Sequence, residues 1–222
     1  MIPAPETPPQ AAPTTSATAS TTFPKDAGGL TLITCHANAD FDAFAGMLAA
    51  RFLYTPHVLL FPGSQERGLQ KLVAGLDMAA LGIVETAAIP WSDITRLVVV
   101  DTRQRGRVSH VAQLLDRADV TLELWDHHPD STDDLSSPHT HMGNTGSVTS
   151  LIVHSIAGRG LSMSAEDATL LGLGIYGDTG SFTYSSTTQA DFQAAAWLLG
   201  MGMDVNRIDA LAAHELTSLH IQ

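Results

Sequence analysis

The order of hydrophobic and polar positions predicts alternating strands and helices from Leu30 onward. Short apolar runs of strand length are followed by longer segments whose apolar residues recur at helical spacing. The expected strands are residues 30–34, 57–61, 97–100 and 120–125. The expected helices are residues 41–53, 109–117, 147–157, 165–176 and 189–199. Such alternation predicts an α/β fold that is Rossmann-like, with a mostly parallel sheet flanked by helices.

Composition divides the chain into three expected segments. Residues 1–28 are rich in Pro, Ala, Thr and Ser and offer little to bury, so a disordered leader is expected there. This leader lacks the basic start and apolar core of a secretory signal. Residues 29–200 form the expected α/β domain. Residues 201–222 are expected to be a C-terminal helical extension or the start of a linker to a further domain.

Charge and cysteine content narrow the function classes. The chain has 11 Lys and Arg against 23 Asp and Glu, a formal net charge of −12. This balance argues against a broad nucleic-acid-binding face, so any nucleic-acid substrate is expected to be short. The single cysteine, Cys35, excludes an intramolecular disulfide framework, and no apolar run approaches the roughly 20 residues that span a bilayer. We therefore expect a cytoplasmic protein without membrane contact.

Acidic residues and histidines gather where the expected strands end. The run LTLIT leads into CHANADFD, LVVV leads into DT, and VTLELW leads into DHH. In an open parallel sheet, the carboxyl ends of the strands line the crevice where ligands bind. A further acid in GIYGDTGSF follows a largely apolar helix and is the candidate to complete this site. The candidate residues are His36, Asp40, Asp42, Asp101, Asp126, His127, His128 and Asp178.

These residue types suit a pair of divalent metal ions. Asp40 could simply cap a helix and Asp101 could be a turn residue, but neither explanation covers the whole set. Three adjacent ionisable residues after a buried strand, such as DHH, are costly unless they are paired or bind metal. Mixed imidazole and carboxylate ligands favour manganese, iron, cobalt or zinc. Two such ions about 3.5 to 4 Å apart can activate water and clamp a phosphate.

The motifs HANADFDA, VVVDT, DHH and GDTGSF, in this order, resemble those of the DHH phosphoesterase superfamily. That superfamily includes RecJ-like exonucleases, oligoribonuclease and pAp phosphatases, and manganese pyrophosphatases. Residues 36–67 are more similar still to the N-terminal DHH domain of bacterial CBS-domain poly(A) polymerase or tRNA nucleotidyltransferase proteins, often called exopolyphosphatase-related. The resemblance spans about residues 30–199. No GGGH-type motif of the accompanying DHHA1 domain is detected.

The resemblance implies a ligand set for two divalent ions, expected to be Mn²⁺ with Mg²⁺ or Co²⁺ as alternatives. His36 and Asp40 would hold the first ion, and Asp42, His127 and Asp178 the second. Asp101 would bridge both ions, and a metal-bound water would be the nucleophile. His128 would face the substrate phosphate and stabilise or protonate the leaving group. Asp126 would orient a ligand histidine, so the expected catalytic residues are His128, Asp101 and Asp126.

Two further segments supply expected substrate contacts. The segment DTRQRGRV places Arg103, Arg105 and Arg107 beside the expected metals, and Arg103 is the first choice for phosphate contact because arginine suits bidentate phosphate recognition. GNTGSVTS, which includes Asn144, is a small-residue loop that enters a helix and can present backbone amides to an anion.

The leading functional hypothesis is a hydrolase that cleaves phosphoester bonds in small nucleotides or short oligonucleotides. An exopolyphosphatase or pyrophosphatase is the first alternative. The second is a non-catalytic or regulatory metal-binding module of a larger RNA nucleotidyltransferase. A homodimer and further CBS, DHHA1 or nucleotidyltransferase domains in a longer protein stay open as partners.

Overall fold

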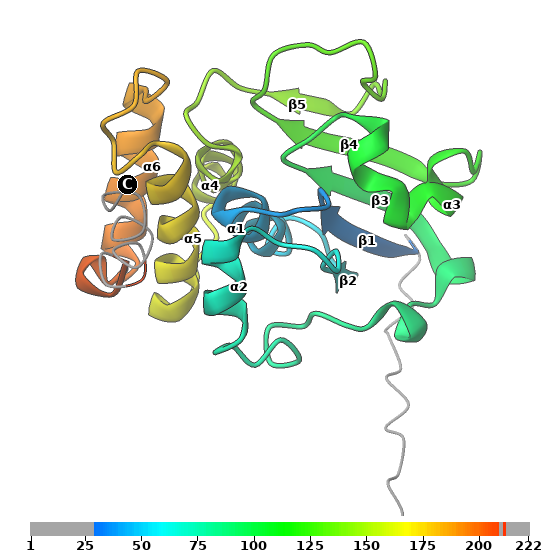
Figure 1. The fold of residues 1–222 in the computed structure, drawn as a ribbon, viewed down its shortest axis with the longest axis horizontal. Coiled ribbons are helices and arrows are strands. Elements are labelled where there is room, and N and C mark those ends of the chain that lie inside the picture. Colours follow the sequence, from blue (N-terminus) through cyan, green and yellow to red (C-terminus); the bar gives the residue numbers. More distant parts are fainter. Residues whose placement is uncertain (1–28, 209–210, 212–222) are drawn as a thin grey trace, which may run out of the picture.

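A single parallel sheet organises the fold in the computed structural model, which describes residues 29–208 and Leu211. Its strands lie in the order β2-β1-β3-β4-β5, and every neighbouring pair is parallel (Figure 1). The strands are β1 (Leu30–Cys35), β2 (His57–Leu60), β3 (Ile94–Val100), β4 (Thr121–Asp126) and β5 (Thr140–Met142). The expected leader lies outside the described residues, as does most of the expected C-terminal extension.

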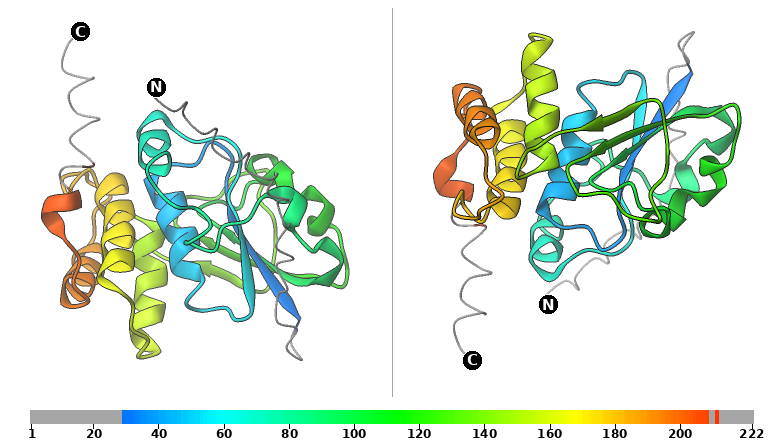
Figure 2. Two further views of the ribbon diagram at one scale, coloured as in Figure 1. Left: turned by 90° about the horizontal axis from the view of Figure 1, so that it is seen from below. Right: turned by 90° about the horizontal axis from the view of Figure 1, so that it is seen from above.

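Helices cover both faces of this sheet, as the α/β prediction requires. The helices are α1 (Phe41–Ala50), α2 (Arg67–Val73), α3 (Ala112–Leu115), α4 (Val148–Gly158), α5 (Ala165–Asp178) and α6 (Gln189–Gly200). Helices α1 and α4 contact the sheet, α5 packs on α1, and α6 packs on α4 and α5 (Figure 2). The 3-10 helix Arg105–Val111 and α3 pack on the other face. Successive strand residues point to opposite faces, which divides the core into two clusters.

Glycines allow three helices to approach one another closely on the α1 face. A Cβ atom built on Gly46 of α1 would lie 2.7 Å from Val100 of β3, and one on Gly174 of α5 would lie 2.5 Å from Ala45 of α1. Neither space admits a methyl group without movement of its neighbours. Close packing therefore fixes where α1 begins relative to the strand ends.

Several elements differ from the sequence-based expectations. Helix α1 ends at Ala50 rather than residue 53, because Phe52 and Leu53 form tighter turn bonds to residues three positions earlier. The expected helix over residues 109–117 is instead the 3-10 helix followed by the four-residue α3, with a non-helical Val108 inside the 3-10 segment. Helix α2 and strand β5 were not predicted. Strand β5 forms the sheet edge, where His141 stacks on Trp125 at 4.0 Å between ring centroids.

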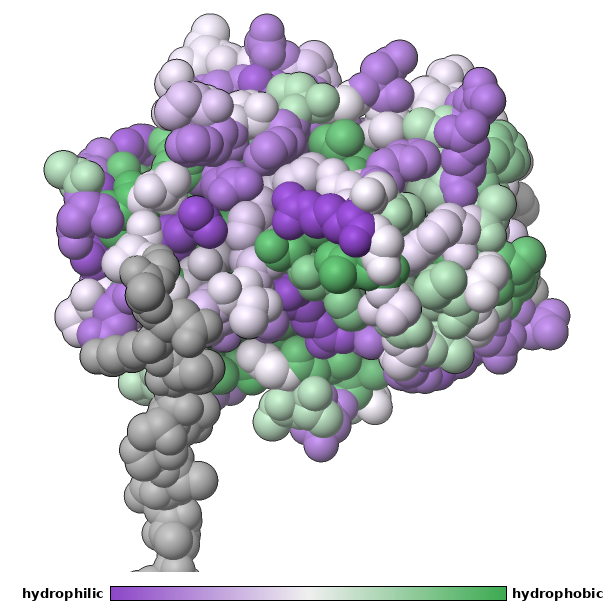
Figure 3. All heavy atoms as spheres, turned by 180° about the vertical axis from the view of Figure 1, so that it is seen from behind, coloured by the Kyte–Doolittle hydropathy of each residue, from purple (hydrophilic) through white to green (hydrophobic). Residues whose placement is uncertain are grey.

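The strand order reverses between β1 and β3, which both lie in the middle of the sheet. Chain connections leave this point in opposite directions, so the strand ends open a crevice there. His36 follows β1 and Asp101 follows β3 directly. On the face seen from behind Figure 1, hydrophobic and hydrophilic residues are interspersed (Figure 3). No helix in the described part of the chain is long and apolar enough to cross a membrane.

Candidate metal centre

Six of the predicted metal ligands converge at the carboxyl ends of the strands. They form two groups of potential ligand atoms, and within each group all the atoms lie within 4.8 Å of one another. The first group is His36, Asp40 and Asp101, and the second is Asp42, His127 and Asp178. Asp101 links the two groups, because its carboxylate lies 3.2 Å from His36 Nε2 and 3.4 Å from His127 Nε2. Asp101 and His127 also form a group of the same kind with His128. The assignment of these residues to two ions stays a prediction.

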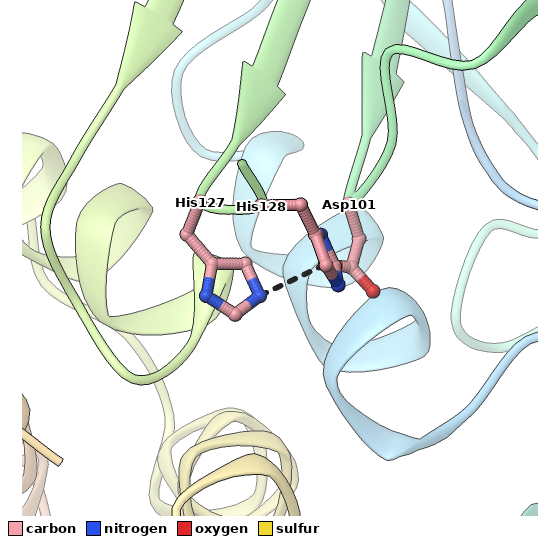
Figure 4. Close-up of side chains that lie close together, drawn as sticks. All are labelled: Asp101, His127 and His128. Carbon is pink, nitrogen blue, oxygen red and sulfur yellow. Dashed lines mark ion pairs between the residues drawn. The ribbon is translucent and has the colours of Figure 1, made fainter. Parts of the chain in front are cut away.

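Asp101 and His127 both bury polar atoms that make no hydrogen bond. These atoms are Asp101 Oδ1 and His127 Nε2, which form an ion pair with each other at 3.4 Å (Figure 4). The two side chains come from the ends of the neighbouring strands β3 and β4. Asp101 also has a backbone φ of 64°, a conformation that non-glycine residues rarely adopt. Buried polar atoms without a hydrogen bond and local backbone strain are costly, and both are typical of a site whose ligand completes the interactions.

The N-terminus of helix α4 holds the Asp42 carboxylate. Asp42 Oδ2 accepts a hydrogen bond of 2.6 Å from the Val148 amide, and Oδ1 accepts one of 3.0 Å from the Thr149 amide. The loop GNTGSVTS therefore presents its helix amides to an anion, as expected, but that anion is a carboxylate of the chain itself. Asp40 is the N-cap of α1 and accepts a bond from the Ala43 amide at 2.9 Å. The helix-cap explanation is thus correct for Asp40 without excluding metal binding.

Backbone and carboxylate groups orient the two histidines of the DHH motif. His127 Nδ1 lies 3.1 Å from the Thr145 carbonyl oxygen. If Nδ1–H donates to that oxygen, the lone pair of Nε2 points toward Asp101 and Asp178, as a ligand requires. Asp126 lies 2.8 Å from His128 Nδ1 and accepts from the His127 and His128 amides. Its carboxylate therefore orients His128, which was not predicted to be a ligand.

Burial and mutual charge shift the pKa values of these groups strongly. Burial and the nearby Asp101 charge together raise the pKa of Asp178 to about 6. Burial alone would raise the pKa of Asp101, but its interactions with His127 and His36 outweigh this effect and lower it to about 2. Burial opposes the charged form of His127, yet the surrounding carboxylates raise its pKa to about 10. The metal-free cluster therefore shares protons that metal ions would displace.

The predicted substrate contacts lie in different surroundings. Arg103 is buried, and its guanidinium lies 3.0 Å from Asp126 and within 3.1 Å of Asp130 and Asp134. It also donates to the His128 carbonyl oxygen at 2.9 Å, so these neighbours occupy most of its five donors. Asn144 is exposed in the loop before α4. Its contact with substrate stays a prediction.

Three features of the centre were missed by sequence reasoning. Asp178 is the last residue of α5, which extends two residues beyond the expected end. The Thr145 carbonyl that orients His127 belongs to the glycine-containing loop, whose small residues are the only sequence signal for it. Arg107 contacts the His36 ring, with Nη2 2.9 Å from Nδ1 and 3.1 Å from Nε2. Nothing in the segment RQRGR distinguishes this arginine from its two neighbours.

The described residues fit a pair of divalent ions. The ligand atoms are oxygens and imidazole nitrogens, the donor set that suits manganese and similar ions. The two buried atoms that make no hydrogen bond, one from Asp101 and one from His127, belong to these groups. Cations there would satisfy both atoms and offset the gathered carboxylate charge.

Known proteins resemble the chain in both sequence and fold. No protein-family model matches it. It is 37% identical over 187 residues to the A-adding tRNA nucleotidyltransferase of Geobacter sulfurreducens, over 84% of this chain and 21% of the relative. It is 34% identical over 110 residues to a probable bifunctional oligoribonuclease and PAP phosphatase of Streptococcus mutans, over 49% of this chain and 34% of the relative. The match thus spans about a fifth of the Geobacter protein and about a third of the Streptococcus protein.

A solved structure shares the fold. The exopolyphosphatase-related protein from Bacteroides fragilis superposes with a TM-score of 0.67 and 19% identity, over 83% of this chain and 56% of that protein. At this identity the likeness concerns the fold alone. It agrees with the parallel α/β sheet and its flanking helices described above.

Proposed function

Since this chain belongs to the DHH phosphoesterase superfamily, we propose that it hydrolyses phosphoester bonds of small nucleotides or short oligonucleotides with two divalent metal ions. The observation that carries this proposal is the pair of three-residue ligand groups joined by Asp101. Manganese is the proposed metal, with magnesium or cobalt as alternatives. When bound, such ions supply positive charge that activates water and offsets the charge of the phosphate.

The protein residues divide the remaining work. His36 and Asp40 would hold the first ion, Asp42, His127 and Asp178 would hold the second, and Asp101 lies within reach of both groups. His128 is the group nearest to solvent, since its side chain is 45% exposed. Its hydrogen bond to Asp126 raises the pKa of His128, which favours the protonated ring. With Nδ1 held by Asp126, Nε2 is free to donate a proton to the leaving oxygen.

Two alternatives are supported by particular observations. A phosphoanhydride substrate such as polyphosphate suits the same ligand groups, because a pair of divalent ions can clamp a phosphate whichever of its bonds is cleaved. A metal-binding module within a larger RNA nucleotidyltransferase is suggested by the Geobacter relative, of which this chain matches 21%. The first alternative differs from the leading proposal in its substrate, and the second differs because the chain would bind metal without catalysing a reaction. One hydrolysis assay on several substrates therefore separates all three.

The test is product release by the purified chain with Mn²⁺ on pAp, dinucleotides, short oligoribonucleotides, pyrophosphate and polyphosphate. The matched control is Asp101→Asn, which keeps the size of the side chain and tolerates a positive φ. We expect nucleotide products from the wild type and a loss of roughly 10³-fold or more in the variant, as for removal of a group that acts in the transition state.

Each other outcome has a definite meaning. Cleavage of polyphosphate or pyrophosphate alone favours the phosphoanhydride alternative. Metal binding without turnover of any substrate contradicts the hydrolase proposal for this chain and favours the module. Equal activity in wild type and Asp101→Asn would show that the activity arises elsewhere or from a contaminant.

A further inference from the structure

The three arginines of the segment RQRGR differ in their neighbours. Arg103 is surrounded by three carboxylates, and Arg105 forms a surface ion pair with Asp116 at 2.7 Å. None of the described carboxylates forms an ion pair with Arg107. Its charged end lies instead against the His36 ring, which belongs to the first ligand group.

This position conflicts with a metal ion unless an anion is also present. Arginine stays protonated at all ordinary pH values, so Arg107 keeps its charge beside the metal group. A divalent cation held by His36 and Asp40 would repel it at a distance of a few ångströms. Either Arg107 moves away or an anion lies between the two cations, and the phosphate of a substrate is the anion that such a centre admits.

A cavity beside Arg107 provides a place for that anion. Its volume is about 210 Å³, and its lining includes Arg107, His128 and Arg103, together with Asp126, Asp130 and Asp134, the three carboxylates that pair with Arg103. This volume is below the roughly 300 Å³ at which pockets for drug-sized ligands begin, so it suits one phosphate group rather than a whole nucleotide. His128 and Arg107 line the same cavity, which brings the proposed proton donor and a free guanidinium to one ligand.

We propose that Arg107, rather than Arg103, binds a substrate phosphate at the metal centre, and that its charge couples phosphate binding to metal binding. The inference rests on the proposed metal-dependent function and adds a residue that recognises the substrate. The planar guanidinium offers two parallel N–H groups to phosphate oxygens. Arg103 is a positioning residue, because its donors hold Asp126 and the carbonyl of His128 in place.

The proposal predicts effects of opposite sign on the two ligands. Without phosphate, loss of the Arg107 charge removes a repulsion and tightens Mn²⁺ binding. With metal bound, the same loss removes a charge-assisted contact and weakens phosphate binding. By thermodynamic reciprocity, phosphate and Mn²⁺ tighten each other in the wild type, and the part of this coupling that Arg107 carries disappears in its variants.

The experiment measures Mn²⁺ affinity by calorimetry with and without inorganic phosphate, in wild type, Arg107→Gln, Arg107→Lys and Arg105→Gln. Arg105→Gln is the matched control, because it removes the same charge from the same segment at an exposed site. In Arg107→Gln we expect Mn²⁺ alone to bind roughly fivefold tighter and phosphate to bind roughly tenfold weaker or worse. Arg107→Lys keeps the positive charge but lacks the two parallel N–H groups of the guanidinium. In this variant we therefore expect weaker phosphate binding and unchanged Mn²⁺ affinity.

The outcomes separate this proposal from the proposed function. If Arg107→Gln and Arg105→Gln behave alike while Asp101→Asn loses metal, the role of Arg107 is wrong and the metal centre stands. If the wild type binds no Mn²⁺, both proposals fail. If Arg107→Gln unfolds, Arg107→Lys decides, since unchanged phosphate affinity there contradicts bidentate recognition.

Discussion

The first turn of helix α1 and its middle use burial in different ways. In the middle, Gly46 and its neighbours are fully packed against β3, α4 and α5, and a single added methyl group would collide with them. In the first turn, Asp42 is equally buried but carries a carboxylate whose pKa is raised by burial and by the Asp101 and Asp178 charges. The middle is completed by the fold itself, whereas the first turn gathers carboxylate charge that the proposed cations would offset. Substitutions in the two regions should therefore fail in different ways.

The largest effect is expected from Asp42→Asn. This change removes the charge of a proposed ligand and turns an NH₂ group toward one of the Val148 and Thr149 amides, so that this amide loses its acceptor. We expect a loss of activity of roughly 10³-fold, about 4 kcal/mol in transition-state terms. The loss should persist when rates are corrected for the folded fraction measured by circular dichroism. If the corrected activity equals that of the wild type, Asp42 contributes to folding rather than to catalysis, and the first turn of α1 has the same structural role as its middle.

Metal removal should have the next largest effect. If Mn²⁺ binds only the folded chain, a concentration of 100 times its Kd stabilises the fold by about 2.7 kcal/mol. Chelation should lower the unfolding midpoint of the wild type and leave that of Asp101→Asn unchanged. Thermal unfolding with and without chelator checks this. Identical midpoints in the wild type would mean that the carboxylate cluster needs no cation.

Gly174→Ala should destabilise the packing of α5 against the middle of α1. The new Cβ would meet Ala45 at 2.5 Å and the Thr149 hydroxyl at 2.9 Å, an overpacking that costs about 1 to 3 kcal/mol. The matched control is Gly158→Ala at the end of α4, where a Cβ meets nothing within 4 Å. That control should be neutral or slightly stabilising. Urea titration measures the free energy of unfolding of both variants, and equal values would contradict the close packing of α5 on α1.

The smallest effect per step is expected from a change of one pH unit. Metal ligands must be deprotonated, and in the metal-free centre Asp178 has a pKa of about 6 and His127 one of about 10. The pKa values of His36 and Asp42 are raised as well. Mn²⁺ affinity should therefore rise with pH, by about tenfold per unit, or 1.4 kcal/mol, for each ligand proton that must leave. Calorimetric titrations between pH 5 and 8 test this, and a flat profile would contradict proton displacement.

Strand ends were the most predictable part of the centre. Strands β1, β3 and β4 are marked by apolar runs, and a polar residue ends each run because it leaves the sheet there. The convergence of His36, Asp101 and His127 followed from parallel pairing alone. The short β5 and the 3-10 helix lacked comparable patterns, since each depends on packing against the sheet rather than on its own periodicity.

The amino-acid sequence by itself determined the α/β class, the order of the strand-end motifs and the identity of the residues that meet at the centre. Periodicity carries that information because burial on a sheet or helix face repeats with the backbone. Only the tertiary structure decided which of the three arginines has no carboxylate partner and which backbone groups hold Asp42 and His127. Those assignments depend on contacts between segments far apart in the chain, and on distances of a few ångströms that local pattern does not encode.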